Sequence, residues 1–147
     1  MIWSFDSNVE ERAYLHKALS ATERSVIVTD EHERIVGVSR RWVDLCGFLP
    51  TEAFGQTPRI LQGVATDLTA ARLFVSQVRN GSEARVVLLN YSKTGDVFRH
   101  ELMGWQHGDL LVAVTLRVDA TSLLTMPLAS RPDLSTGTWY SHTHQPQ

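Results

Sequence analysis

Three apolar segments that follow one another closely constrain the fold of this chain most. They span residues 84–91 (ARVVLLNY), 97–105 (VFRHELMGW) and 110–118 (LLVAVTLRV). Each contains several residues that favour strands, and the short segments between them carry glycine with other turn-forming residues. Strands joined by such short turns pair antiparallel with their neighbours. The pattern therefore predicts a three-stranded antiparallel meander.

Two more strands are predicted ahead of this meander, with helices between the two groups. The segments VIVTD (Val26–Asp30) and RIVGV (Arg34–Val38) flank a polar turn and predict a hairpin. Three helices are bounded by capping or terminating residues, with starts at Ser39, Pro50 and Asp67 and ends at Gly47, Gly55 and Gly81. We therefore expect an α+β fold in which a five-stranded antiparallel sheet carries short helices on one face.

The two ends of the chain are expected to extend this domain. Residues 7–10 have the spacing of a capping box, and Tyr14, Leu15, Ala18 and Leu19 recur at helical spacing. This predicts an amphipathic helix within residues 1–24, ahead of a domain at residues 25–121. Residues 122–147 are rich in Ser, Thr and Pro and show no periodicity, so most of this tail is expected to be disordered.

Charge and composition argue against several classes of function. A formal charge of −2 and a pI near 6.3 provide no basic field for nucleic acid. Cys46 is the only cysteine, so the chain has no internal disulfide and no CxxC motif, which fits the cytoplasm. We expect no membrane span, no secretory signal and no enzymatic activity, because no apolar run, leader or catalytic constellation stands out. His142 and His144 are too few for a metal site.

Two segments resemble the signatures of the light-oxygen-voltage (LOV) family of PAS domains. Residues 55–63 (GQTPRILQG) fit six of the nine positions in the signature Gly, any residue, Asn, Cys, Arg, Phe, Leu, Gln, Gly. Residues 90–100 are similar to a second signature, with Asn-Tyr, a basic turn containing glycine, an aromatic residue and a second Asn. The separation of the two segments is also that of the family. The resemblance runs from VIVTD to LRVDAT and implies a PAS fold.

The resemblance also implies a flavin cofactor, FMN, with riboflavin or FAD as alternatives. A buried flavin ring needs hydrogen-bond partners along its pyrimidine edge, and amide side chains supply them. Asn90 and Gln62 match ring-contacting positions, and Arg59 matches the position that pairs with the phosphate. Thr29 and Leu61 stand at further matched positions. The same residues also suit a turn, a solvated loop or an ordinary strand, and those interpretations stay open.

Two departures from the family concern the thiol and the phosphate. Pro58 stands where the family has its photoreactive cysteine, so the cysteinyl bond to flavin C4a is excluded at this position. Cys46 is expected to be a buried packing residue and not a replacement. Val75 stands where many members have a second phosphate-binding Arg, with Arg72 close enough to substitute. Losing one charge-assisted contact would cost about 1.5–3 kcal/mol, so riboflavin or FAD would compete with FMN.

Two further departures lie near the presumed ring edge. His100 stands in place of the second Asn, and a neutral imidazole donates from one nitrogen and accepts at the other. Arg117 matches the family's signalling Gln, unless the strand slips by two residues and Thr115 takes that place. A guanidinium only donates, so an amide-flip switch is unavailable. Both residues also suit surface positions, and that alternative stays open.

The leading interpretation is a sensory LOV-like flavoprotein that signals by flavin photoreduction or redox state without a cysteinyl adduct. Trp42, Trp105 and Tyr91 are candidate electron donors, although aromatic residues of small domains are mostly core. The alternative is a PAS domain without ligand that serves dimerisation or protein interaction. In either case we expect a homodimer or an effector protein to be bound through the N-terminal helix and the sheet.

Overall fold

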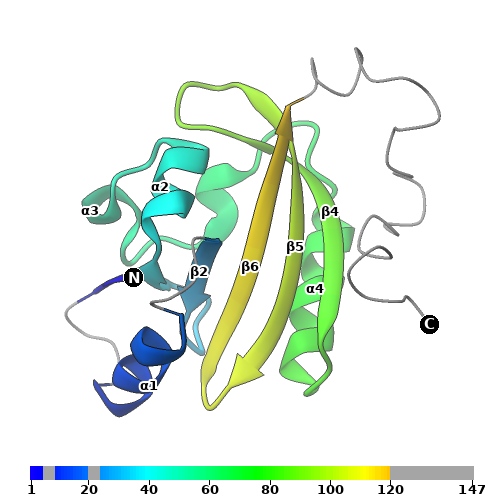
Figure 1. The fold of residues 1–147 in the computed structure, drawn as a ribbon. Coiled ribbons are helices and arrows are strands. Elements are labelled where there is room, and N and C mark those ends of the chain that lie inside the picture. Colours follow the sequence, from blue (N-terminus) through cyan, green and yellow to red (C-terminus); the bar gives the residue numbers. More distant parts are fainter. Residues whose placement is uncertain (5–8, 20–23, 120–147) are drawn as a thin grey trace.

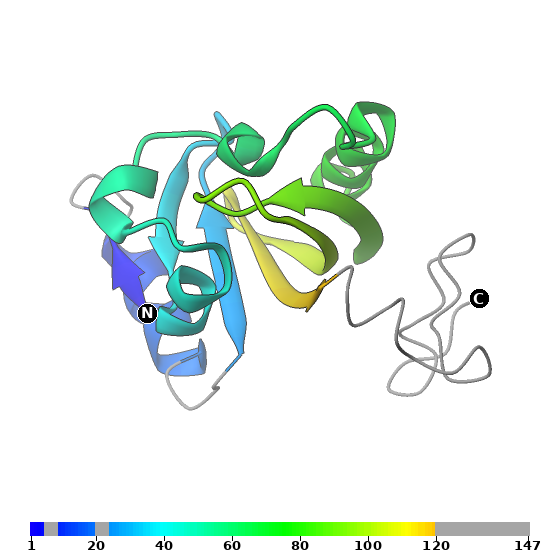
Figure 2. The ribbon, with the colours of Figure 1, turned by 90° about the horizontal axis from the view of Figure 1, so that it is seen from above.

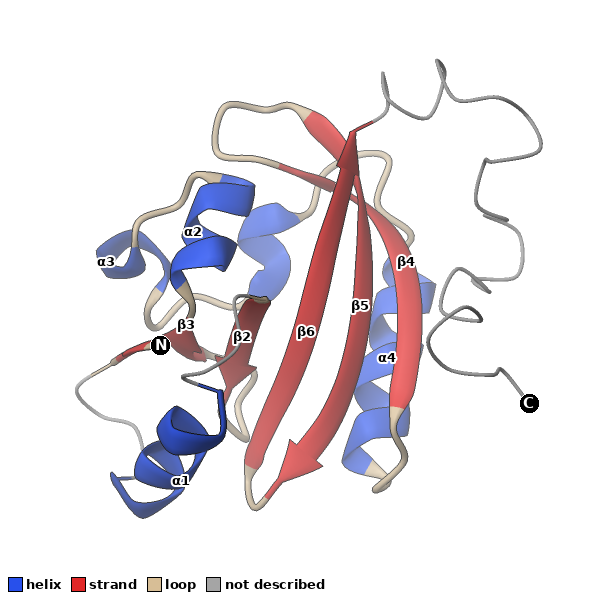
Figure 3. Cartoon of the chain, in the orientation of Figure 1, coloured by secondary structure: helices blue, strands red, loops and turns tan. Residues whose placement is uncertain are grey.

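An antiparallel sheet organises the chain in the computed structural model, which describes residues 1–4, 9–19 and 24–119. The strands are β1 (Ile2–Trp3), β2 (Ser25–Thr29), β3 (Ile35–Val38), β4 (Ala84–Tyr91), β5 (Val97–His107) and β6 (Leu110–Asp119). The helices are α1 (Val9–Leu19), α2 (Arg40–Cys46), α3 (Pro50–Ala53), the 3₁₀ helix η1 (Pro58–Leu61) and α4 (Leu68–Arg79). Figures 1 and 3 show this arrangement, and the α+β fold expected from the sequence is confirmed.

The sheet has six strands in the described residues, one more than expected, in the order β1-β3-β2-β6-β5-β4. The additional strand is β1, which pairs antiparallel with the outer edge of β3 through Ile2 and Trp3. Gly37 makes room for it, because a Cβ atom at that position would lie 2.6 Å from the Trp3 ring. A two-residue strand shows no alternation in sequence, and so the pattern did not indicate it.

The capping residues place the helices where the sequence predicts them. Ser39 Oγ accepts from Trp42 N, and Gly47 ends α2 in the left-handed conformation with a φ of 83°. The Asp67 side chain accepts from Ala70 N at the start of α4 (3.0 Å). Gly81, with a φ of 89°, follows the end of that helix. These local contacts satisfy backbone groups that a helix end leaves free.

The meander folds back so that the last strand lies beside the first strand of the hairpin. β6 pairs antiparallel with β2, and Ser25 lies opposite Thr115. Their hydroxyl oxygens are 2.7 Å apart, so one donates to the other although 90 residues separate them in sequence. This pairing puts β2, β6, β5 and β4 side by side and gives the sheet one continuous inner face.

Apolar residues fill both faces of the sheet. The inner face packs against α2, η1 and α4, and Figure 2 shows this helical segment opposite the strands. On the outer face α1 buries Leu15 against Val26, Val28 and Val112. Tyr14 of the same helix stacks on His107, with ring centroids 4.7 Å apart. The predicted capping box at residues 7–10 begins outside the described residues, and the predicted tail at 122–147 lies wholly outside them.

Candidate functional site

A cavity of about 560 Å³ lies between the inner face of the sheet and the helical segment. Small-molecule sites typically have volumes of roughly 300–1,000 Å³, so its size suits a ligand. Strands β2, β4, β5 and β6 supply one wall, and α2, η1 and α4 supply the other. The cavity therefore occupies the space between the two layers of the fold.

The wall of the cavity is mainly apolar. Its apolar members include Ile27, Trp42, Leu61, Phe74, Val75, Leu88, Leu102, Leu111 and Ala113. Gly104 on β5 allows Phe74 to approach the sheet, because a Cβ atom there would lie 2.7 Å from the Phe74 ring. An apolar wall with a few polar groups favours a ligand with an aromatic or aliphatic body.

Asn90 on β4 and His100 on β5 form a buried polar pair in this wall. Their exposed fractions are 4% and 1%. In the amide orientation that satisfies every neighbour, Asn90 Oδ1 lies 2.9 Å from His100 Nδ1 and accepts from it. Asn90 Nδ2 then donates to the carbonyl oxygens of Leu61 (3.2 Å) and Leu89 (3.3 Å). The pair thus connects β4 and β5, the last two strands of the sheet, to the end of η1.

The environment keeps His100 neutral. Burial, and then the positive charge of Arg117, lower the pKa of His100 from 6.5 to about 3. With Nδ1–H donating to Asn90, the second ring nitrogen Nε2 carries a lone pair. This atom is buried and has no hydrogen-bond partner among the described residues. The same holds for Nε1–H of Trp42, which also lines the cavity.

The η1 segment brings four of the predicted site residues to the cavity. Thr57 caps the turn by accepting from Arg59 N, and Pro58 occupies the first helical position. A proline is compatible with this position because its missing N–H would have no partner in the helix. Pro58, Arg59, Leu61 and Gln62 all line the cavity. The departure at Pro58 therefore leaves the local fold of the signature segment intact.

Four exposed residues with polar side chains line the cavity. Arg59 and Arg72 both line it and both are exposed. His32 and Glu33, from the turn between β2 and β3, line it as well. Two guanidinium groups at an accessible rim suit an anionic group of a ligand, such as a phosphate.

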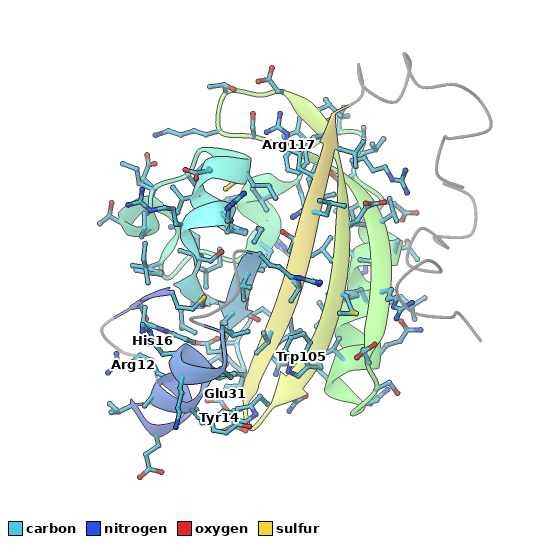
Figure 4. The ribbon with its side chains drawn as sticks, in the orientation of Figure 1. Arg12, Tyr14, His16, Glu31, Trp105 and Arg117 are labelled. Atoms are coloured by element: carbon cyan, nitrogen blue, oxygen red, sulfur yellow. The ribbon has the colours of Figure 1, made fainter. Side chains whose placement is uncertain are left out.

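Arg117 is the one predicted site residue that does not line the cavity. It lies on β6 opposite His100, and Figure 4 shows its position near the upper end of this strand. Its Nη1 atom donates to the carbonyl oxygen of Leu45 at the end of α2 (2.7 Å). Its guanidinium carbon lies 4.6 Å from the centre of the Phe98 ring. Thr115, the alternative match, bonds Ser25 and is not part of the cavity wall either.

The thiol of Cys46 is separate from the cavity wall. Cys46 is buried, and its Sγ–H donates to the carbonyl oxygen of Trp42 (3.2 Å). Burial raises the pKa of this thiol to about 11, which disfavours the reactive thiolate. Cys46 is therefore a packing residue of the helix, as expected from the sequence.

The other predicted residues meet in the cavity. Thr29, Pro58, Arg59, Leu61, Gln62, Asn90 and His100 line it together, with Arg72. Their roles toward a ligand stay predictions. The sequence predicts Trp42 only as a candidate electron donor, and it does not indicate that His32 and Glu33, in the polar turn after Asp30, line the cavity. Helical spacing from the cap at Ser39 puts Trp42 on the inner face of α2, but spacing alone does not separate a core position from a cavity wall.

Neither a metal site nor a membrane span is found in the described parts of the chain. Within residues 1–4, 9–19 and 24–119, no three His, Cys, Asp or Glu side chains gather to hold a metal ion. His142 and His144 lie outside these ranges. Each described helix is too short or too polar to cross a bilayer.

Comparisons with known proteins identify the fold and its relatives. No protein-family model matches the chain. A blue-light photoreceptor of Listeria innocua is 30% identical over 112 residues, which make up 72% of this chain and 44% of that protein. Phototropin-1A of Oryza sativa subsp. japonica is 28% identical over 114 residues, which are 73% of this chain and 12% of the phototropin. The chain thus spans less than half the length of these two curated relatives.

A solved structure of a light-oxygen-voltage domain, from a study with a flavin analogue, matches the fold with a TM-score of 0.65. It is 28% identical, and the match covers 74% of this chain and 87% of that chain. The matched region thus spans most of that domain. The strand order, the cavity and the two signature segments agree with this likeness, and the chain is similar in sequence and in fold to light-oxygen-voltage domains of the PAS type.

Proposed function

We propose that this chain is a flavin-binding sensory domain that responds to blue light or redox state without a cysteinyl adduct. The observation that carries the proposal is the cavity, which combines an apolar body, a buried polar pair and an arginine rim. A flavin has matching parts, with an aromatic ring, a polar pyrimidine edge and, in FMN, a phosphate. The bound flavin would supply absorption of blue light and the capacity to accept electrons.

Two buried polar atoms of residues that line the cavity support this fit. His100 Nε2 is an acceptor and Trp42 Nε1–H is a donor, and neither has a partner among the described residues. Leaving a buried donor or acceptor unsatisfied costs about 1–3 kcal/mol. A ring edge with alternating donors and acceptors would satisfy such groups, whereas a purely apolar ligand would not.

The arginine rim supports a phosphorylated flavin. Arg59 and Arg72 would bind the phosphate of FMN, and Gln62 would contact the ring from the end of η1. Because both arginines are exposed, water screens their charges, and FMN would bind more tightly than riboflavin by a moderate factor.

The adduct-free response follows from the position of the thiol. Pro58 lines the cavity, whereas Cys46, the only thiol of the chain, does not. Light would then act by electron transfer, and Trp42 is the candidate donor because its ring belongs to the cavity wall. Trp105 packs with the outer cluster, and Tyr91 instead accepts from Ala65 N through its hydroxyl (2.9 Å). These two residues are thus less direct donors.

The signal would leave through the outer face of the sheet. Helix α1 is held there by Leu15 and by the stacking of Tyr14 on His107. Figure 4 shows Tyr14 and Trp105 in the lower part of the view, near the turn that joins β5 and β6. A homodimer or an effector protein bound at α1 and the sheet would sense a change in the position of the helix.

One observation favours the second candidate, a PAS interaction module without ligand. The amide of Asn90 is already satisfied by His100, Leu61 and Leu89. The residue that matches the family's ring-contacting Asn thus has internal partners, as a ligand-free domain would need. The cavity volume and the unpartnered His100 and Trp42 atoms argue for the first candidate.

The two candidate functions predict different visible absorption spectra for the purified protein. The full chain, purified from cells supplied with riboflavin, should have the visible spectrum of bound flavin, and blue light with a reductant should bleach it slowly. A protein that stays colourless after addition of FMN would refute flavin binding and support the interaction module. Fast, reversible bleaching without a reductant would refute the adduct-free response.

A further inference from the structure

The hydrogen bond between buried Asn90 and His100 has a direction, from donor to acceptor, that the sequence does not reveal. Of the two amide orientations of Asn90, only one puts its Nδ2 against the carbonyl oxygens of Leu61 and Leu89. The other orientation would place Oδ1 against these two carbonyls, with three acceptors facing one another in a buried site. The first orientation is therefore the stable one, and in it Oδ1 faces His100.

This orientation assigns the proton of the imidazole. Asn90 Oδ1 is only an acceptor, so His100 Nδ1, 2.9 Å away, must carry the hydrogen. A neutral imidazole has one N–H, and consequently Nε2 is the bare acceptor. Nε2 is buried without a partner, and the side chain lines the cavity. The site thus presents a fixed acceptor and not a group that can switch between donating and accepting.

We propose that His100 selects the ligand of this cavity by accepting a hydrogen bond from an N–H group of its ring, with Asn90 as the positioning residue that fixes the tautomer. The inference rests on the proposed flavin function. The oxidised isoalloxazine ring has one N–H, at N3, and its other edge atoms accept. The geometry therefore points to N3–H as the group that bonds His100 Nε2, a contact for which an asparagine would offer either of two groups.

Selection of the ligand by a hydrogen-bond acceptor can be distinguished from selection by the size and shape of the ligand alone. A ring that lacks the N–H group leaves Nε2 buried and unsatisfied, and should bind less well by about tenfold. 3-Methylriboflavin is such a ring, because a methyl group replaces the hydrogen at N3. Removal of the acceptor should abolish the preference, whereas a merely steric preference would survive in a variant that keeps the bulk of the imidazole.

The experiment measures binding of riboflavin and 3-methylriboflavin to the full chain by quenching of flavin fluorescence. The wild-type protein should prefer riboflavin by about tenfold, and His100→Phe, which keeps a ring of similar size, should bind the two within about twofold. His107→Phe is the matched control, because His107 stacks on Tyr14 at the outer face and does not line the cavity. It should keep the tenfold preference.

A second measurement tests the tautomer in the unmodified protein and does not depend on the folding of a variant. The ¹⁵N chemical shifts of the His100 ring should show a protonated Nδ1 and a bare Nε2 in the chain without flavin. A protonated Nε2 would overturn the assignment of the acceptor.

The outcomes separate this inference from the proposed function. Equal affinity of the wild-type protein for the two flavins would overturn selection by His100 while leaving flavin binding established. A preference retained in His100→Phe would overturn it as well, in favour of steric exclusion. Failure of the wild-type protein to bind either flavin would refute the proposed function, and selection with it.

Discussion

The neutral state of buried His100 has a consequence for stability that can be calculated. The pKa of His100 is lowered to about 3 in the folded chain by burial and by the charge of Arg117, against about 6.5 in an unfolded chain. Below the higher of these values the unfolded chain binds a proton that the folded chain does not. Lowering the pH through this range therefore favours unfolding.

The size of the effect follows from proton linkage. Between about pH 7.5 and about pH 5, the protonation of one such histidine in the unfolded state removes about 2 kcal/mol from the free energy of unfolding. The result depends mainly on the unfolded pKa, because the folded group stays neutral at both pH values. This loss is a substantial share of the stability of a typical domain.

The assay is urea unfolding of the chain without flavin at several pH values, for the wild-type protein and for His100→Phe. Subtracting one pH profile from the other is necessary because Glu101 titrates in an overlapping range with the opposite sign. Burial raises the pKa of Glu101 to about 7, even though Arg99 Nη2 lies 2.6 Å from its Oε1. The contribution of Glu101 to the free energy of unfolding therefore falls as the pH rises, and it does so equally in the wild-type protein and in His100→Phe.

The difference between the two profiles should grow by about 2 kcal/mol from pH 7.5 to pH 5, the wild-type protein losing more. Profiles that remain parallel would refute the argument, because they would mean that His100 is protonated to the same extent when folded and when unfolded.

Three further predictions concern the cavity and its neighbourhood. Pro58→Cys would put a thiol in the cavity wall, and its flavin absorption should then bleach reversibly under blue light without a reductant; a flavin-loaded variant that does not bleach would show that position 58 is out of reach of the ring. Arg59→Ala should weaken FMN by about two- to fivefold, because this arginine is exposed, and should leave riboflavin, which has no phosphate, nearly unchanged in a fluorescence titration. Gly63→Ala would bring a methyl group against the ring of Tyr91 and should lower the free energy of unfolding by about 1–3 kcal/mol, measured in urea; an unchanged midpoint would contradict this packing.

Local signals in the sequence were sufficient for most of the secondary structure. Ser39, Gly47 and Asp67 act within one helical turn, and the structure has them at the helix ends that they predicted. The pairing of β6 with β2 depends instead on contacts between residues some 90 positions apart. Only the resemblance to a family implied it. Strand β1 was not predicted, because two residues are too few to show the alternation of a strand.

The candidate site shows a similar division. The two signature segments predicted that Arg59, Gln62, Asn90 and His100 belong to one site, and all four residues line one cavity. That Asn90 bonds His100 depends on the register of β4 and β5 and on the rotamers of both side chains, which sequence does not specify. Matching by position likewise put Arg117 at the ring edge, whereas its long side chain reaches the end of α2.

The departures at positions 100 and 117 are physically linked. The two residues face each other on β5 and β6, and the charge of Arg117 adds to burial in keeping His100 neutral. Arg117 is in turn stabilised by the carbonyl end of α2, where a helix attracts cations, and by the face of the Phe98 ring. A neutral glutamine at position 117 would remove this charge and raise the pKa of His100 toward its ordinary value, although burial would still hold it low. The arginine therefore helps to preserve the acceptor on which the proposed selection of the ligand depends.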